Sequence, residues 1–230
     1  MWSTVLRTSL HLPSTLIERI EQAIFPPLCS SCRTRMPLRV PLCRTCQTSS
    51  RRILPLTYQH RHVTVNVYSI GAYEGAIQKL ILSKNYGQAY GAQALAQLLA
   101  AEHLDKIMDA QCIMPVPLHW SRKMWRGFNQ SEIIARHLSR HSHVPVDTHM
   151  HRATKTPQLT RLSITERNAI MQNVFALPGN SLAHKVHYHG AHVVIVDDVY
   201  TTGTTVKSMI TVLKKMGVRR VTVLVAARVI

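Results

Sequence analysis

The chain has 230 residues, 46% of them hydrophobic, which is enough for one α/β domain with a packed core and a small additional module. Its 28 Lys and Arg against 11 Asp and Glu give a net charge of +17, which favours polyanions, nucleic acid first, as partners. A small basic protein with no specific partner is the alternative. No apolar run is as long as a membrane span and Arg7 interrupts the first one, so we expect a cytoplasmic protein with neither a signal peptide nor a membrane span.

The N-terminal part predicts a short helix followed by a cysteine module. Apolar residues share one helical face over residues 14–24, and Pro26 ends this helix. Two CxxC pairs follow, with ten residues between them: Cys29 and Cys32, then Cys43 and Cys46. Four thiolates at this spacing suit a tetrahedral Zn²⁺ site, which is closed and therefore structural. Two disulfides, or a redox role for one pair, are the alternatives.

The basic side chains around the cysteines are all arginine. They are Arg33, Arg35, Arg39, Arg44, Arg51 and Arg52, with Arg61 further along. Because the planar guanidinium group binds phosphate oxygens in pairs, this composition favours a contact with nucleic acid. A partner protein, or solubility alone, would also explain it. We expect residues 1–62 to hold the helix, the module and a linker over 47–61, and residues 63–230 to form the α/β domain.

Strand and helix patterns alternate through this second part. Strands are predicted over residues 63–70, 111–118, 193–196 and 221–225, and helices over 77–84, 89–104, 129–140, after the capping box at 163–166, and over 206–216. Such alternation is typical of a parallel sheet with helices packed on its faces.

The corner after residues 193–196 carries the strongest functional signal. Asp197 and Asp198 follow the strand, and a loop of small residues precedes the helix: Thr201, Thr202, Gly203, Thr204 and Thr205. The first turn of a helix has free backbone N–H groups and the positive end of the dipole, which together bind phosphate. The acids would repel that phosphate, so we expect them to bind ribose hydroxyls or Mg²⁺. The alternative is a plain capped helix, although a cap needs only one such residue.

A second strand-to-helix corner is cationic. The strand at 111–118 ends in Pro115-Val-Pro, which marks its exit into a loop. The loop and the start of the following helix carry Arg122, Lys123, Arg126, Asn129 and Gln130. A diphosphate between the two corners would meet cations on one side and backbone N–H groups on the other.

Residues 193–205 resemble the signature of type I phosphoribosyltransferases, which bind phosphoribosyl pyrophosphate (PRPP). The chain is similar over nearly its whole length to the ComF family of ComFC- and GntX-like proteins. This resemblance depends on the two CxxC pairs, Pro115-Val-Pro-Leu, Arg126-Gly-Phe-Asn-Gln130 and the run from Asp197 to Thr205. It implies an α/β fold of the type I phosphoribosyltransferase kind, with a parallel sheet flanked by helices, behind an N-terminal double zinc ribbon.

The resemblance also implies roles for individual residues. The two acids match the ribose-binding pair and the threonine loop matches the cradle of the 5′-phosphate, with Mg²⁺ accompanying PRPP. The pyrophosphate loop and a lid would use Lys84, Arg126, Asn129, Gln130, Arg152, Arg161 and Arg167, unless the last two merely pair with Glu166. Thr201 departs from the purine-salvage members, which carry an Asp there, and Asn85 stands where a Phe is expected after Lys84.

Two functions follow from this resemblance. The first is a protein that binds PRPP and single-stranded DNA and acts in DNA uptake or in the use of external DNA, together with other competence or DNA-processing proteins. The second is an active phosphoribosyltransferase with an unidentified acceptor. Thr201 favours the first, because a hydroxyl group is a poor general base.

Overall fold

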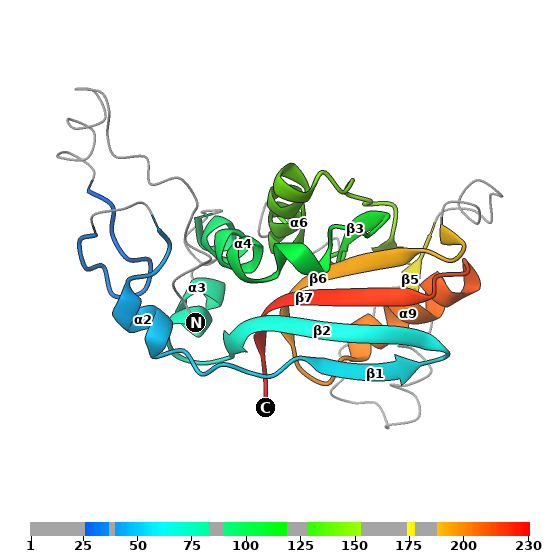
Figure 1. The fold of residues 1–230 in the computed structure, drawn as a ribbon, viewed down its shortest axis with the longest axis horizontal. Coiled ribbons are helices and arrows are strands. Elements are labelled where there is room, and N and C mark those ends of the chain that lie inside the picture. Colours follow the sequence, from blue (N-terminus) through cyan, green and yellow to red (C-terminus); the bar gives the residue numbers. More distant parts are fainter. Residues whose placement is uncertain (1–25, 37–39, 83–89, 119–127, 153–173, 178–187) are drawn as a thin grey trace.

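A five-stranded sheet forms the centre of the molecule. The computed structural model describes residues 26–36, 40–82, 90–118, 128–152, 174–177 and 188–230. The strands lie in the order β1 (Leu56–His60), β2 (Val63–Ala72), β7 (Arg220–Arg228), β6 (His192–Tyr200) and β3 (Cys112–Pro115) (Figure 1). Four of them run parallel, as predicted, and β1 pairs antiparallel with β2 at one edge. The helices predicted over 14–24 and after 163–166 lie outside the described residues.

Strand β1 corrects part of the predicted linker over residues 47–61. It follows Pro55 and makes a tight hairpin with β2, in which Leu56 lies opposite Val67 and His60 opposite Val63. The alternating residues of β1 are half-buried and exposed, the pattern of an edge strand with one covered face. The division at residues 62 and 63 stays a prediction, but residues 56–60 belong to the sheet.

Helices cover both faces of the sheet. On one face lie α3 (Gly75–Leu82), α4 (Tyr90–His103) and α6 (Gln130–Ser142), and on the other lies α9 (Thr204–Lys215) (Figure 1). Strand β6 serves both layers, because Val194 packs on the first face and Val193 and Ile195 on the second. A 3₁₀ turn, η2 (Leu104–Lys106), follows α4, and a small sheet pairs β4 (His151–Arg152) with β5 (Phe175–Ala176).

Within the described residues, the predicted elements of this domain are confirmed in type, while several ends differ. The helix expected over 206–216 begins at Thr204, and the one expected over 129–140 continues to Ser142. The largest difference is in β6, which does not end at Val196 but continues through both acids to Tyr200. The pairing with β7 explains this, since Asp197 lies opposite Val225 and Tyr200 opposite Arg228.

The cysteine module packs directly on the domain. Cys29, Met36 and Leu42 are buried in the same apolar cluster as the residues of α3 and α4. The module's short helix α2 (Arg44–Thr48) leads into a backbone contact, in which Ala72 N–H donates to Arg51 O at 2.9 Å. Gly71 permits this approach, because a Cβ atom there would lie 2.8 Å from Arg51 O.

Candidate functional site

The two predicted corners meet at the carboxyl-terminal edge of the sheet. After β3 the chain continues to α6 on one face, and after β6 it turns into α9 on the other. Strands β3 and β6 are neighbours, with Pro115 opposite Val196. Loops that leave adjacent strands toward opposite faces create the crevice in which open α/β sheets bind their ligands. The topology therefore makes this edge the candidate ligand site.

Asp197 is held in place by groups from both corners. Its Oδ1 accepts the Asp198 backbone N–H at 2.9 Å and the Ser131 hydroxyl of α6 at 3.3 Å. The pKa of Asp197 rises to about 7, because burial and the neighbouring Asp198 carboxylate both disfavour its charged form. A positive ion or a ribose diol at this point would relieve that penalty. The contact with Ser131 was not predicted, and the sequence offers no signal for it beyond the adjacent helix cap.

The threonine loop leads into a helix N-terminus that offers donors. Gly203 is the N-cap of α9 and has a φ of 71°. Because glycine has no side chain, this residue cannot accept hydrogen bonds from the first N–H groups of the helix through a side-chain atom. The helix carries no acid in its first turn, and Thr202 Oγ1 lies 2.7 Å from Thr204 Oγ1. A Cβ atom on Gly203 would collide with the hydroxyl of Tyr200, which in turn donates to Tyr58 at 3.3 Å. Loop and helix together form an uncapped, neutral donor site of the kind that binds phosphate.

The second corner places polar groups beside the acids. Asn129 caps α6, where its Oδ1 accepts Ser131 N–H at 3.1 Å and its Nδ2 donates to Val116 O at 3.0 Å. Gln130 is buried and its Oε1 has no hydrogen-bond partner among the described residues. Both side chains therefore lie at the start of α6, next to the serine that contacts Asp197.

Other predicted residues lie elsewhere or outside the described part. Arg152 belongs to β4, and its guanidinium group lies over the Phe175 ring of β5, 5.7 Å from the ring centre. Its assignment to a lid stays a prediction. Six further candidates fall outside the described residues, as does Arg39 of the module: Lys84, Arg122, Lys123, Arg126, Arg161 and Arg167.

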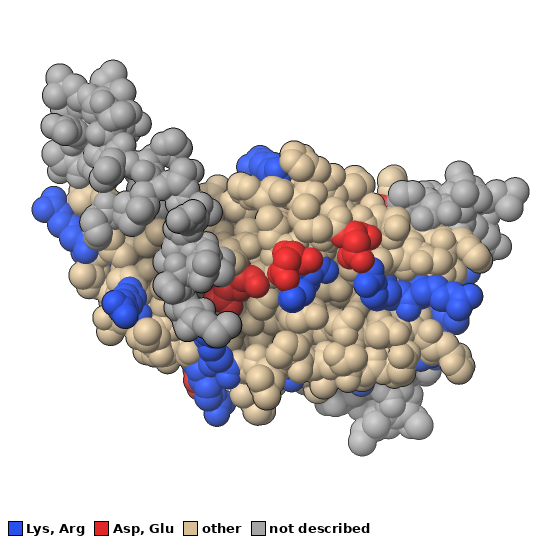
Figure 2. Space-filling model, viewed as in Figure 1, with Lys and Arg blue, Asp and Glu red and all other residues tan. Residues whose placement is uncertain are grey.

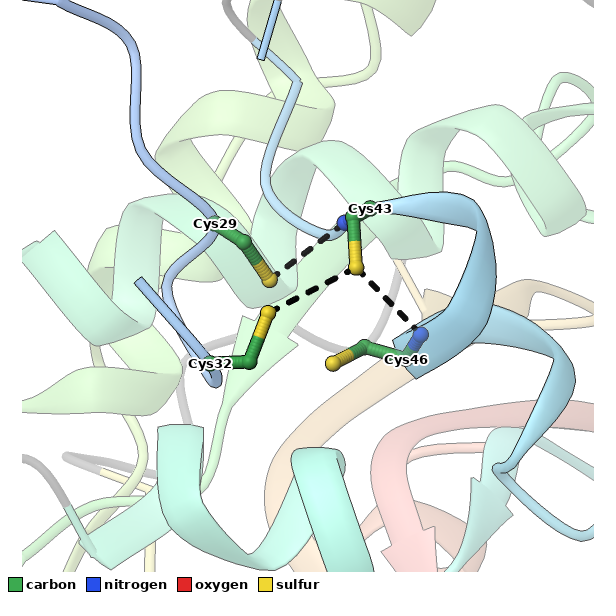
Figure 3. Close-up of side chains that lie close together, drawn as sticks. All are labelled: Cys29, Cys32, Cys43 and Cys46. Carbon is green, nitrogen blue, oxygen red and sulfur yellow. Dashed lines mark hydrogen bonds between the residues drawn. The ribbon is translucent and has the colours of Figure 1, made fainter. Parts of the chain in front are cut away.

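The four cysteines of the module form one cluster. Their sulfur atoms all lie within 4.8 Å of one another and point toward a common centre (Figure 3). Backbone N–H groups donate to two of the sulfurs, from Cys43 to Cys29 at 3.3 Å and from Cys46 to Cys43 at 3.5 Å. All four are free thiols in this structure, so they do not form the alternative disulfides. This donor set and spacing fit a tetrahedral metal ion, because Zn–S bonds of about 2.3 Å separate the sulfurs by slightly under 4 Å.

The pKa values of the cysteine thiols bear on whether the cluster can bind a metal cation. Hydrogen bonding with Thr34 lowers the pKa of the exposed Cys32 thiol to about 6. Burial and the neighbouring thiols raise the pKa of Cys46 to about 12. A bound metal ion would supply the positive charge that lets all four ligands ionise together.

The module arginines that the structure describes are exposed. These are Arg33, Arg35, Arg44, Arg51 and Arg52. Arg51 lies 3.5 Å from Glu74, an exposed ion pair of small energetic weight. Figure 2 shows basic side chains scattered over the end of the molecule that holds the module, whereas acidic and basic groups alternate over the middle of this face.

Comparison with known proteins agrees with this geometry. Residues 125–229 match the family model of the phosphoribosyl transferase domain, and the match includes α6, β6, the threonine loop and α9. The DNA utilization protein YhgH of Escherichia coli K12 is 37% identical over 141 residues, which cover 57% of this chain and 58% of that protein. Competence protein F of Haemophilus influenzae is 31% identical over 129 residues, covering 56% and 55%.

The chain is similar to these competence and DNA utilization proteins over somewhat more than half of its length. The predicted resemblance to the ComF family is thereby confirmed, as is the fold class. The chain spans somewhat more than half the length of the curated relatives it matches. Among solved structures, orotate phosphoribosyltransferase from Aeropyrum pernix is 19% identical, with a TM-score of 0.38 and coverage of 64% of this chain and 62% of that one. No helix in the described part of the chain is long and apolar enough to cross a membrane.

The raised pKa of Asp197 predicts a pH-dependent stability. Its unfolded value lies near 3.8, so the folded protein binds the extra proton between about pH 4 and pH 7 and loses this contribution as the pH rises through 7. Asp197→Asn keeps an oxygen acceptor and removes the charge. We expect it to be more stable than the parent by about 2 kcal/mol above pH 7, and to show no such gain at pH 4.

Urea unfolding at several pH values in Mg²⁺-free buffer measures this difference. Asp105→Asn is the matched control, because Asp105 is exposed and pairs only with its neighbour Lys106. Equal pH dependence in the parent and in Asp197→Asn would show that burial does not perturb this carboxyl group.

Proposed function

We propose that this protein binds PRPP or a related ribose phosphate, with Mg²⁺, at the carboxyl-terminal edge of its sheet. The observation that supports this most directly is the pair Asp197 and Asp198 beside the uncapped N-terminus of α9. The acids would accept hydrogen bonds from the ribose diol or hold Mg²⁺, and the first N–H groups of α9 would hold the phosphate. The phosphoribosyl transferase match over residues 125–229 supports the same ligand.

We further propose that the protein also binds single-stranded DNA and acts in the cytoplasm in DNA uptake or in the use of external DNA. The names of the relatives, DNA utilization protein and competence protein, support this role. The exposed arginines of the cysteine module and the net charge of +17 supply a sequence-neutral attraction for phosphates. Other competence or DNA-processing proteins would then be its partners.

An active phosphoribosyltransferase is the second candidate, and one observation favours it. A carboxyl group with a pKa of about 7 at the ligand edge, as in Asp197, is suited to accept a proton from an acceptor substrate. Thr201 has no comparable basicity, so we place PRPP binding without transfer first. If the protein releases pyrophosphate from PRPP in the presence of nucleobases or amines, the active phosphoribosyltransferase becomes the first candidate.

Calorimetric titration of PRPP with and without Mg²⁺ tests the ribose-phosphate site. We expect Asp198→Asn to weaken PRPP binding by about 1 to 3 kcal/mol, because an amide that replaces a carboxylate loses charge-assisted hydrogen bonds or an Mg²⁺ ligand. Asp109→Asn, an exposed acid away from this edge, should bind like the parent. If Asp197→Asn and Asp198→Asn both bind PRPP like the parent, the two acids are not part of the ribose-phosphate site.

We also propose that the four-cysteine cluster holds one structural Zn²⁺. The protein purified under reducing conditions should carry about one equivalent, measured by elemental analysis. Cys32→Ser should lose the metal and lower the melting temperature, since the metal contributes folding free energy. Cys32 is suited to this test because it is exposed, so its loss creates no cavity. Thr45→Ala, between two ligands, is the control that should retain zinc. A metal-free protein that melts like the metal-loaded one would contradict the proposal.

Fluorescence anisotropy with a labelled single strand tests the module arginines. If each contacts one phosphate, Arg33→Gln together with Arg44→Gln should make the slope of log K against log salt shallower by about 1.4. Arg136→Gln is the control, because this arginine is paired with Glu132 at 2.7 Å. A slope that Arg33→Gln and Arg44→Gln leave unchanged would exclude the module from DNA contact.

A further inference from the structure

The opposite, amino-terminal edge of the sheet brings three segments together. They are the turn between β1 and β2, the connection from α9 to β7, and the residues before β6. Thr64 N–H donates to Arg219 O at 3.1 Å, and Gly190 N–H donates to Gly217 O at 2.9 Å. Arg220 lies opposite both Thr64 and His192 in the strand register. These segments form one surface at the end of the molecule away from the cysteine module (Figure 1).

This surface is strongly basic. We define the amino-edge surface as Arg61, His62, Lys214, Lys215 and Arg219. No carboxylate among the described residues pairs with its four Lys and Arg side chains. The nearby acid Asp109 is already bound by His192 at 3.0 Å and by Arg220. Figure 2 shows basic side chains gathered at this end of the molecule.

Some cations elsewhere in the described chain are paired with a neighbouring acid. Arg136 pairs with Glu132, Lys106 with Asp105 and Arg51 with Glu74. At the amino edge the charges instead reinforce one another. The neighbouring histidine shows the effect of these positive charges: burial, together with the charges of Arg61 and Lys207, lowers the pKa of His60. Lys214 and Lys215 lie in the last turn of α9, where the helix dipole favours a cation, but Arg61 and Arg219 lie outside any helix and are repelled by the neighbouring charges.

The turn between β1 and β2 adds a second, independent observation. Arg61 and His62 both have positive φ angles, 52° and 63°, between the paired residues His60 and Val63. A two-residue hairpin of this kind is a type I′ turn, which strongly prefers Asn-Gly. The left-handed conformation costs about 1 kcal/mol for a residue such as Arg. The chain thus holds an arginine and a histidine at the tip of the turn, where the backbone favours neither.

We propose that the amino-edge surface binds the phosphate backbone of nucleic acid, at a site separate from the ligand edge and from the cysteine module. Neighbouring strands lie about 4.8 Å apart, so a surface that extends from β1 to β7 spans roughly 10 Å. At about 3.4 Å per nucleotide along one strand, this length matches about three phosphates. Recognition is independent of base sequence, because none of the aromatic residues described at this edge is exposed.

The test measures DNA affinity against salt for the full chain. Anisotropy with a labelled single strand of mixed sequence should give a slope that becomes shallower by about 1.4 in Arg61→Asn/Arg219→Gln. Lys79→Gln/Arg140→Gln is the matched control, since it also removes two positive charges, from exposed positions on α3 and α6. A control as strongly affected as the test variant would show a general effect of net charge and overturn the proposal.

A second variant separates binding from stability. Arg61→Asn/His62→Gly installs the sequence that this turn prefers, so it should melt at a higher temperature than the parent and yet bind DNA several-fold more weakly. A variant that melts higher and binds DNA as tightly as the parent would overturn the proposal, as would one that melts lower. Loss of binding to anionic phospholipid vesicles, with DNA binding unchanged, would assign the surface to a membrane instead. Neither measurement involves PRPP, so the result is independent of the ribose-phosphate site.

Discussion

The parallel pairing of β2, β7, β6 and β3 governs the distribution of chemistry in this protein. Parallel strands place all of their carboxyl ends at one edge, and the helices that follow begin there. The corners after β3 and β6 are therefore brought together although about 80 residues separate them. The same pairing places the loops that precede the strands at the other edge, where unpaired cations accumulate. One topological constraint thus separates an acidic, donor-rich edge from a basic one.

The acidic edge is costly in the absence of a ligand. Two adjacent carboxyl groups repel each other. Both lie within the paired part of β6, which continues past Val196 to Tyr200. Ser131 and the Asp198 backbone N–H stabilise one oxygen of Asp197 but do not neutralise its charge. Binding sites commonly retain such unfavourable arrangements, because the ligand supplies the missing interactions.

Much of this fold and site could be predicted from sequence, for definable reasons. Asp197, Asp198 and the threonine loop stand out as a candidate site because strand, acids, glycine and helix follow one another locally. Strand β1 was missed because its short segment follows a proline and has few β-branched residues, so only its pairing with β2 reveals it. The contact from Ser131 to Asp197 and the clustering of Arg61 with Arg219 depend on pairing between distant segments, which local periodicity does not encode.

The contact between Arg51 O and Ala72 N–H has a mechanical consequence. It joins the end of the cysteine module to the end of β2, and the absence of a side chain on Gly71 allows the two backbones to approach this closely. Cys29 and Leu42 add a shared apolar contact with α3 and α4. The module is therefore packed against the domain rather than joined to it by a linker alone. A strand of nucleic acid bound to the module would have a fixed orientation relative to the rest of the protein.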